Sequence, residues 1–240
     1  MNTAIIVPTY KEFDNIEKLI NSILKVLKKP LIIIVDDSPD RRTEERIKKF
    51  ENIHYIYRGR KLGRGSAVID GMKQLIDRID IDRIIEMDAD LSHDPNELNV
   101  NLSVFKKENL DLLISSRYLK NSKIINWSIQ RRIFSLLANK LARFFLDIPI
   151  SDYTNGYRIY SKNAINHIVV NCGKVGDGFI ILSEILVELY FNNFKIQETS
   201  SIFKNRIRGD SSVNLKLILD SFFGLLKIYK IKKKITNKAN

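Results

Sequence analysis

Short apolar runs alternate along the chain with segments in which apolar residues recur every three or four positions. The runs predict buried strands at Thr3–Pro8, Leu31–Val35, Ile53–Tyr57, Ile84–Met87, Leu112–Ser115, Ile159–Tyr160 and Ile196–Phe203. The periodic segments predict helices at Asn15–Leu27, Thr43–Phe50, Ala67–Ile76, Asn96–Lys107, Ile133–Leu146 and Ile180–Tyr190. This alternation is typical of an α/β domain with a mainly parallel sheet flanked by helices.

Polar residues that follow three of these strands are the first indication of a site. They are Tyr10 and Glu12 after the first strand, Asp36 and Asp37 after the second, and Asp88 and Asp90 after the fourth. Ligands of open α/β sheets bind outside the carboxyl ends of the strands, so we expect these side chains to converge. Any single carboxylate in such a place could instead cap a helix.

The segment Asp88-Ala89-Asp90 carries the most specific chemistry. On an extended chain, alternate residues point to the same side, with Cα atoms roughly 7 Å apart. The two carboxylates repel each other unless a positive group lies between them. A hard divalent cation with oxygen ligands, which usually brings a phosphate with it, suits this position.

A glycine-rich segment, Lys61–Ala67, leads into the third predicted helix. Its glycines permit unusual backbone angles and the close approach of a ligand. Val68 occupies the third glycine position of a Rossmann fingerprint, and the Gly-Lys-Ser/Thr ending of a P-loop is missing. A dinucleotide or ATP site is therefore disfavoured, and a simple turn remains the alternative.

Two helical segments are rich in apolar residues. In Ile133–Leu146 the polar positions fall on one side, at Ser135, Asn139, Lys140 and Arg143. This pattern suits either a core helix or a helix that lies on a membrane. The apolar tail from Leu215 to Ile231 runs into a lysine cluster, which suits an interfacial helix on an anionic leaflet or a packed terminal helix.

The composition indicates a globular protein with an anionic partner. The formal net charge is +12, with 40 Lys and Arg residues against 28 Asp and Glu residues. A nucleic acid, a phosphorylated substrate or an anionic membrane could balance this charge. The single cysteine, Cys172, excludes an intrachain disulfide and suits a buried apolar position. We expect neither a signal peptide nor a transmembrane helix.

Taken in order, these segments resemble the inverting GT-A glycosyltransferases of family 2, and more narrowly the dolichyl-phosphate (polyprenyl-phosphate) mannose synthases. The resemblance covers roughly Asn2–Ser212. The matching segments are Pro8–Glu12, Val35–Asp40, Gly63–Ala67 with Gly71, Met87–His93, Ser115–Tyr118, Arg131–Ser135, Asp152–Arg158 and Phe203–Ser211. The implied fold is a GT-A, Rossmann-like domain at residues 1–212, with an amphipathic basic tail at residues 213–240.

The resemblance implies a role for each matching residue. The nucleotide sugar would be bound by Pro8, Tyr10, Glu12, Val35, Asp36, Asp37, Lys61, Gly65, Ala67, Asp88, Ala89 and Asp90. Asp88 and Asp90 would hold Mg²⁺ or Mn²⁺, and Arg117, Arg131 and Ser135 would bind the acceptor phosphate. Catalysis would fall to Asp90, Arg117, Arg131 and Arg206, and the late motifs would contribute Asp152, Asn155, Arg158, Gly209 and Ser211. Ser92 departs from the family pattern, which often has glutamine there, so the third protein ligand of the metal is left open.

The implied reaction moves mannose from GDP-mannose to dolichyl or polyprenyl monophosphate and gives a β-linked lipid phosphosugar. A phosphate monoester is mostly dianionic at pH 7 and can attack without a general base. We therefore expect no catalytic role for His54, His93 or His167. The protein would lie on the cytoplasmic face of the cell or endoplasmic reticulum membrane.

Three other functions fit parts of the pattern. UDP-glucose or UDP-N-acetylhexosamine could be the donor, with a polyprenyl phosphate or a glycan as acceptor. A nucleic-acid-binding module would explain the charge alone, but the basic residues are interleaved with Leu, Phe and Ile rather than set on a stacking sheet or a recognition helix. A membrane adaptor without catalytic activity is the third.

Overall fold

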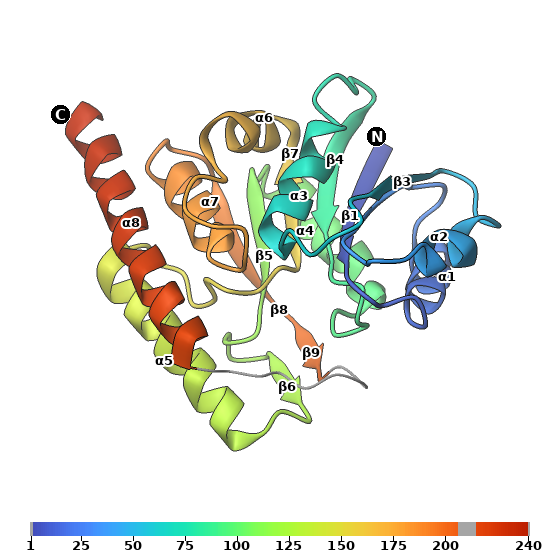
Figure 1. Cartoon of the computed structure of the whole chain (residues 1–240). Helices are drawn as coiled ribbons and strands as arrows, with labels where there is room; N and C mark the ends of the chain where they lie inside the picture. The colour runs from blue at the N-terminus through green and yellow to red at the C-terminus, as the bar shows by residue number, and fades with distance from the viewer. Residues whose placement is uncertain (1, 206–214, 240) are drawn as a thin grey trace.

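The computed structural model describes residues 2–205 and 215–239, and its centre is a seven-stranded sheet (Figure 1). The strand order is β3-β2-β1-β4-β7-β5-β8. These strands are β1 (Asn2–Thr9), β2 (Leu31–Asp36), β3 (Ile53–Tyr57), β4 (Ile81–Glu86), β5 (Leu112–Ser116), β7 (Arg158–Ser161) and β8 (Ile196–Ser200). Two short strands, β6 (Lys123–Ile125) and β9 (Ile202–Lys204), pair with each other in a second sheet.

The main sheet is parallel except at β7. β1 pairs in parallel with both β2 and β4, and the register places Thr9 opposite Asp36. β7 runs antiparallel between β4 and β5, with Arg158 opposite both Glu86 and Ile114. The carboxyl ends of the other six strands therefore lie at the same edge of the sheet, together with the start of β7.

Helices cover both faces of the sheet. They are α1 (Ile16–Val26), α2 (Arg42–Ile47), α3 (Arg64–Lys73), α4 (Leu98–Lys107), α5 (Ile129–Leu146), α6 (Lys162–Asn171), α7 (Ile181–Tyr190) and α8 (Leu215–Ala239), with a 3-10 turn at Pro95–Glu97. Alternate residues of β1 point into two different cores. Ile5 and Val7 pack with α1 and α4, whereas Ala4 and Ile6 pack with α3, α6 and α7. Strands buried on both faces are the reason for their continuous apolar runs.

The α/β architecture and the mainly parallel sheet are confirmed, but one predicted strand is wrong. Ile196–Phe203 is not continuous, because the chain leaves the main sheet at Ser201. There the Glu97 carboxylate accepts hydrogen bonds from the Ser201 hydroxyl, at 2.6 Å, and from the Ile202 N–H, at 2.7 Å. These bonds replace a strand ladder, and β9 turns to pair with β6 instead of β5.

A further helix, α6, was not predicted; it lies between the predicted elements at Tyr160 and Ile180. The Ser161 side chain accepts a hydrogen bond from the Ala164 N–H and caps the helix. Ile165 and Ile168 bury the inner face against the core. Cys172, just after this helix, is buried as expected.

Candidate active site

The carboxyl edge of the sheet gathers the acidic residues singled out in the sequence. Asp36 ends β2, Glu86 ends β4, and Asp88 and Asp90 follow in the next turn. Asp36 and Glu86 are fully buried, whereas Asp88 and Asp90 are half-buried. A buried carboxylate is destabilising unless it is paired or hydrogen-bonded, and at this edge arginine, tyrosine and backbone groups provide those contacts.

Asp37 connects the β2 end to the glycine segment. It accepts hydrogen bonds from the Leu62 and Gly63 N–H groups, both at 2.8 Å, and from Nε of Arg58 at 2.5 Å. Asp36 accepts bonds from the Ser38 N–H and from the Tyr55 hydroxyl. These bonds fix the loop that would face a nucleotide, and direct nucleotide contact by Asp36 and Asp37 stays a prediction.

The first loop lies beside the same segment. The Lys61 ammonium lies 4.8 Å from the centre of the Tyr10 ring, and the Lys11 N–H donates to the Ser38 hydroxyl at 2.8 Å. Glu12 accepts from the Asn15 side chain at 2.7 Å. Tyr10 is one of the exposed aromatic residues, whereas Val35 is buried in β2, opposite Pro8 of β1. The structure therefore places Tyr10 beside Lys61 and Asp37 beside Gly63, and nucleotide binding by the predicted set stays a prediction.

Gly65 shows why this segment is rich in glycine. A Cβ atom there would lie 2.6 Å from the Gly178 carbonyl oxygen, so a side chain cannot be accommodated. The Gly65 N–H donates to the Asp177 carbonyl at 2.6 Å. The glycine segment is thus fastened to the turn that precedes α7.

Arg64 occupies the position next to Asp88 where the sequence predicts a cation. Its Nε and Nη2 lie 2.8 and 2.7 Å from Oδ1 of Asp88, and its Nη1 lies 2.5 Å from Oε1 of Glu86. Tyr160 donates to the other oxygen of Glu86 at 2.6 Å. Burial alone would raise the pKa of Asp88, but Arg64, with a smaller effect from His93, holds that pKa below its usual value.

Asp90 has different surroundings. Among contacts between described residues, its Oδ1 accepts the Ser92 N–H at 3.0 Å, and its Oδ2 makes no hydrogen bond. The Ser92 hydroxyl is buried and has no partner in the described part of the chain. A carboxylate oxygen and an unpaired hydroxyl suit a hard cation. Within residues 2–205 and 215–239, however, no three His, Cys, Asp or Glu side chains form a cluster that could hold a metal alone.

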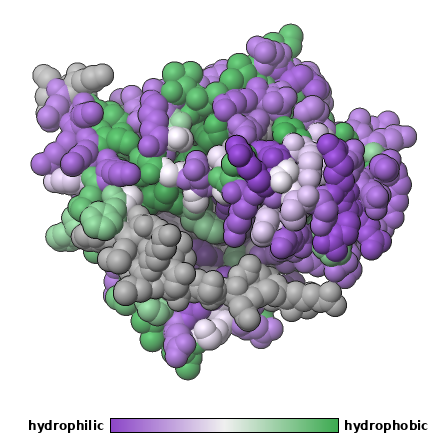
Figure 2. Space-filling view, viewed as in Figure 1, coloured by the Kyte–Doolittle hydropathy of each residue, from purple (hydrophilic) through white to green (hydrophobic). Residues whose placement is uncertain are grey.

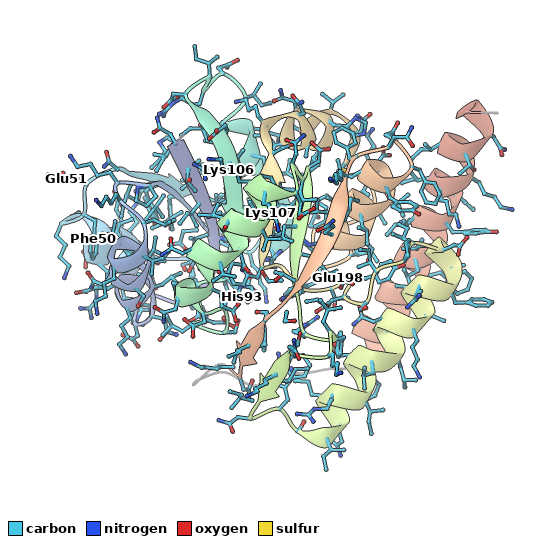
Figure 3. All side chains as sticks on the ribbon, turned by 180° about the vertical axis from the view of Figure 1, so that it is seen from behind. Phe50, Glu51, His93, Lys106, Lys107 and Glu198 are labelled. Carbon is cyan, nitrogen blue, oxygen red and sulfur yellow. The ribbon has the colours of Figure 1, made fainter. Side chains whose placement is uncertain are left out.

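His93 connects the turn at Asp88 with Asn155, and the absence of a catalytic role for it stays a prediction. Its Nδ1 accepts the Asp88 N–H at 3.1 Å, and its Nε2 lies 3.1 Å from the Asn155 side-chain oxygen. The ring stacks on Tyr157, with centroids 5.1 Å apart. Burial lowers the pKa of His93, so the neutral form predominates at pH 7. Figure 3, which views the molecule from the opposite side to Figure 1, shows His93 close to the start of α4.

Arg117 and Asp152 form a buried ion pair beside the aspartates. Nε and Nη2 of Arg117 lie 2.8 and 2.7 Å from the two oxygens of Asp152. Burial would lower the pKa of Arg117, but Asp152 outweighs it and raises that pKa. Asp152 is held in turn by Glu198 on β8, labelled in Figure 3, which accepts its N–H at 2.9 Å.

Trp127 brings the two predicted acceptor arginines together. Its ring centre lies 4.2 Å from the Arg131 guanidinium and 5.3 Å from that of Arg117. Phe203 packs edge-on against the same ring at 5.3 Å. Ser135, one turn further along α5, accepts the Tyr118 hydroxyl at 2.6 Å. We call Arg117, Trp127, Arg131 and Phe203 the arginine cluster.

Asn155 and Arg158 connect these parts of the site from inside. The Asn155 amide donates to the Ser115 carbonyl, and the fully buried Arg158 donates to the carbonyls of Asn155, Tyr153 and Leu182. Both therefore hold the backbone in place. Arg206, Gly209 and Ser211 lie outside the described residues, so their predicted roles stay predictions.

α5 buries a narrow side that carries Asn139, Ala142 and Leu146, and it exposes many of its large apolar side chains. Asn139 is buried, where its oxygen accepts the Tyr153 N–H at 2.7 Å. Ile129, Ile133, Leu137 and Phe144 are instead 78, 52, 57 and 79% exposed. The hydrophobic surface at the lower left of Figure 2 lies over this helix. The core-helix interpretation of this segment therefore holds for Ala142 and Leu146 but is wrong for these four exposed side chains.

α8 packs along α5 and α7 (Figure 1). Phe145 of α5 meets Tyr229 of α8 with ring centroids 6.1 Å apart. A Cβ atom at Gly224 would lie 2.6 Å from the Ile180 side chain, so glycine permits this close approach. No helix among the described residues is long and apolar enough to cross a bilayer.

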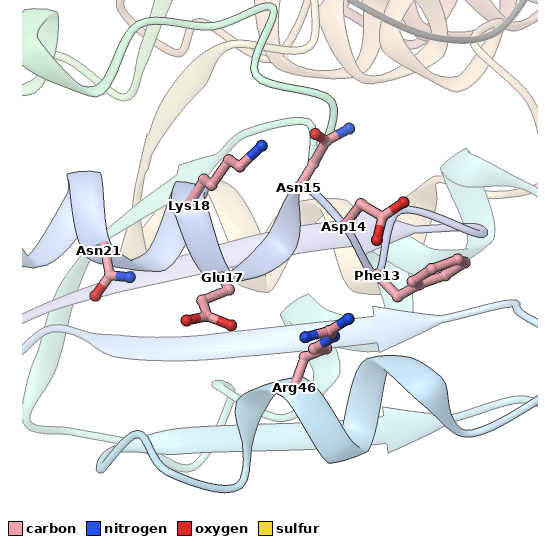
Figure 4. A pocket seen from close by; sticks show the side chains of 7 residues that line it. All are labelled: Phe13, Asp14, Asn15, Glu17, Lys18, Asn21 and Arg46. Atoms are coloured by element: carbon pink, nitrogen blue, oxygen red, sulfur yellow. The ribbon is translucent and has the colours of Figure 1, made fainter.

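A separate pocket of about 570 Å³ lies between α1 and α2 (Figure 4). Glu17 and Lys18 of α1 line it together with Arg46 of α2, and Phe13 closes one end. Glu17 pairs with Lys49 across the helices. None of the predicted site residues lines this pocket, so we do not place the active site there.

Arg58, Arg64 and Glu86 are candidate site residues that were not predicted from the sequence. Arg64 lies within the glycine-rich segment, between Gly63 and Gly65. An arginine at the first position of a helix, next to carboxylates at the ends of strands, is the signal from which Arg64 could have been predicted. Glu86 was hidden within an apolar strand, and only its pairing with Arg64 and Tyr160 reveals its role.

A mainly parallel sheet with an aspartate pair and a glycine turn at its carboxyl edge, beside an arginine cluster, defines the GT-A class of glycosyltransferases. The chain belongs to glycosyl transferase family 2, which it matches over residues 4–169.

Several characterised proteins resemble most of the chain. It is 32% identical to the dolichol-phosphate mannosyltransferase of Pyrococcus furiosus over 97% of its own length, but spans only 64% of that relative. It is 30% identical to the polyprenol monophosphomannose synthase of Mycolicibacterium smegmatis, covering 92% of this chain and 84% of that one. It is also 30% identical to the undecaprenyl-phosphate mannosyltransferase of Micrococcus luteus, covering 90% and 93%.

Solved structures share the fold at lower identity. Glucosyl-3-phosphoglycerate synthase from Mycobacterium tuberculosis with phosphoglyceric acid superposes with a TM-score of 0.69 and 16% identity, over 95% of this chain and 80% of that one. The same synthase with Mn²⁺ and UDP-glucose gives 0.67 and 16%, over 95% and 79%. This likeness concerns the fold alone.

Proposed function

We propose that this glycosyltransferase moves mannose from GDP-mannose to a polyprenyl monophosphate, with inversion at the anomeric carbon. One observation carries the proposal: the acidic carboxyl edge of the sheet meets the arginine cluster beside the exposed apolar face of α5. We call this acidic edge the donor edge, and the arginine cluster with α5 the acceptor side. The acidic edge suits a metal-bound diphosphate, the arginines suit a phosphate, and the apolar face suits a lipid. The mannosyltransferase names of the relatives favour mannose and a polyprenyl carrier.

On the donor side, hydrogen bonds within the chain already fix the loops that would contact the nucleotide sugar. Asp37 and Arg58 fix the loop after β2, and Tyr10 and Lys61 stand at its opening. Asp90 would hold a divalent cation together with the donor diphosphate, and Mn²⁺ is the ion bound in the neighbouring synthase structures. When bound, such a cation stabilises the charge that develops on the departing nucleoside diphosphate.

On the acceptor side, the arginine cluster would orient the lipid phosphate. Arg117 has Nε and Nη2 engaged by Asp152, while no described residue accepts a bond from its Nη1. Arg131 adds a second guanidinium, stacked on Trp127. The phosphate is mostly dianionic near pH 7, so it needs orientation rather than deprotonation.

The apolar face of α5 gives the lipid chain a place to meet the protein. Burying a side chain such as Leu or Phe stabilises an interface by about 1.5–3 kcal/mol. Arg132 and Arg143 flank this face and are exposed, as is Lys140, so anionic headgroups would add to its attraction. We propose that α5, with α8 beside it, rests on the cytoplasmic leaflet.

A donor panel tests the proposal. Purified protein is mixed with Mn²⁺, a short polyprenyl phosphate and GDP-mannose, UDP-glucose or UDP-N-acetylglucosamine. We expect lipid-linked sugar from GDP-mannose, with a β linkage by NMR. Transfer only from a UDP-sugar would contradict the assigned donor, and no transfer from any donor would contradict the function.

A further inference from the structure

Arg64 lies at the centre of the donor edge, yet the family resemblance gives it no role. It is the first residue of α3, and its side chain is only 12% exposed. Its guanidinium contacts Asp88 with two nitrogens and Glu86 with the third. A fork of this kind is among the strongest charge-assisted contacts in proteins.

The surroundings of Arg64 are shaped to receive it. A Cβ atom at Gly156 would lie 1.8 Å from Nη2 of Arg64, so a larger residue at 156 would displace the guanidinium. The Phe179 ring lies 5.1 Å from the guanidinium carbon. Asp88 therefore already has a fixed cationic partner, supplied by the chain, while Asp90 is without one among the described residues.

We infer that Arg64 competes with the divalent metal ion for the Asp88 carboxylate, so that metal alone reaches Asp90 but not Asp88. This inference rests on the metal site of the proposed function. A donor diphosphate offers oxygen ligands to a metal and an alternative anion to a guanidinium. Metal and nucleotide therefore bind together, because the nucleotide draws Arg64 away and opens Asp88.

Arg64 is a positioning residue, because it acts through Asp88. Its removal should strengthen binding of the metal alone, an effect opposite to the loss expected for a ligand. The gain should also depend on Asp88, since the contact that blocks the metal is to that carboxylate. A guanidinium that acted only through space would repel a cation whether or not Asp88 were charged.

Mn²⁺ binding to the full chain, followed by electron paramagnetic resonance without nucleotide, tests this. We expect R64M to lower the dissociation constant for Mn²⁺ at least fivefold. D88N alone should change it less than twofold, and R64M/D88N should lose the gain of R64M. The matched control is R60M, which removes an exposed arginine from the same loop.

A second variant covers the case in which R64M does not fold, since it leaves the buried Glu86 without its arginine. G156A keeps every charge but fills the space that Arg64 occupies, so it should also tighten Mn²⁺ binding. Thermal melts by circular dichroism identify the folded variants. An unchanged or weaker affinity in the folded variants, or a gain that persists with D88N, would overturn the competition.

Adding GDP separates this inference from the proposed function. In wild type, GDP should tighten Mn²⁺ binding, and it should do so less in R64M. If wild type binds Mn²⁺ with GDP but R64M shows no gain without it, only the competition is wrong. If wild type binds no Mn²⁺ even with GDP, the metal site and the inference fall together.

Discussion

The donor edge and the acceptor side of this molecule are stabilised in different ways. At the donor edge, carboxylates pair with arginines of the chain: Asp37 with Arg58, and Asp88 and Glu86 with Arg64. The acceptor side has one such pair, Arg117 and Asp152, and then opens onto apolar side chains exposed along α5. The donor edge is thus arranged for a polar ligand, and the acceptor side leaves apolar surface for a second partner.

The contrast shows what each half needs from its ligand. In the proposed mode of donor binding, a metal and a diphosphate take the place of the arginine at Asp88, so the ligand must replace existing contacts. The exposed apolar side chains have no polar contacts that must be broken on binding, so any surface that removes them from water stabilises the protein. We expect charge changes to affect the donor edge most, and changes in hydrophobicity to affect α5 most.

The largest effect should come from Asp90. D90N removes a negative charge from the unpaired carboxylate without changing its shape, and transfer should fall by about 10²–10³-fold or more. The measurement is the initial rate of sugar transfer with saturating Mn²⁺. D80N serves as a control, because Asp80 lies exposed before β4 at the opposite edge, paired with Arg78. Equal losses in both variants would contradict the special position of Asp90.

The second effect tests the buried pair of the acceptor side. R117M leaves Asp152 charged and buried, which should lower the free energy of unfolding by about 3–5 kcal/mol. R117M/D152N removes both charges and should recover most of that stability without recovering transfer. Urea denaturation gives the stability and the transfer assay gives the activity. Recovery of both would mean that Arg117 serves the fold and does not bind the acceptor.

The third effect tests α5. L137E and F144E place charges on the exposed apolar face, and each should weaken binding to anionic vesicles about tenfold or more, because each loses roughly 1.5–3 kcal/mol of burial. Flotation with phosphatidylglycerol vesicles measures the partition. V170E, at a 71% exposed position on α6, is the matched control. If V170E weakens binding equally, the contact is not specific to α5.

The sequence predicted the donor edge better than the acceptor side, and the reason is physical. Strand-end carboxylates at Asp36, Asp88 and Asp90 follow buried apolar runs, and parallel topology then forces them together. The positions of these carboxylates along the chain are therefore enough to predict that they gather at one edge of the sheet. The break at Ser201 could not be predicted, because it depends on Glu97, which lies 104 positions earlier.

The orientation of α5 shows a second limit. Its periodicity identifies two sides but does not say which one faces the protein. Asn139 turns inward because the Tyr153 N–H needs an acceptor there, a tertiary contact that no local pattern contains. The arginine at position 64 was visible in the sequence, but its pairing with Asp88 depends on where the start of α3 lies relative to the turn after β4.

The smallest effect concerns Glu184, a buried carboxylate that makes no ion pair with an arginine of the described residues. It accepts the N–H groups of Gly173 and Lys174, both at 3.1 Å. Burial raises its pKa above the usual value, in contrast to the lowered pKa of Asp88. The folded state therefore holds a proton on Glu184 at a pH where the unfolded chain has released it.

The sign of the pH dependence follows from this difference. The contribution of Glu184 to stability is complete below its ordinary pKa of 4.5 and is lost as pH rises through the raised value. E184Q cannot titrate, so its stability relative to wild type should increase from pH 4.5 towards pH 7. Thermal melts across this range measure the difference, and other titrating groups cancel because both proteins share them. If the stability of E184Q relative to wild type instead falls with rising pH, the backbone N–H donors alone keep the Glu184 carboxylate ionised. The presence of an arginine would then not explain why the pKa of Asp88 is lowered and that of Glu184 is raised.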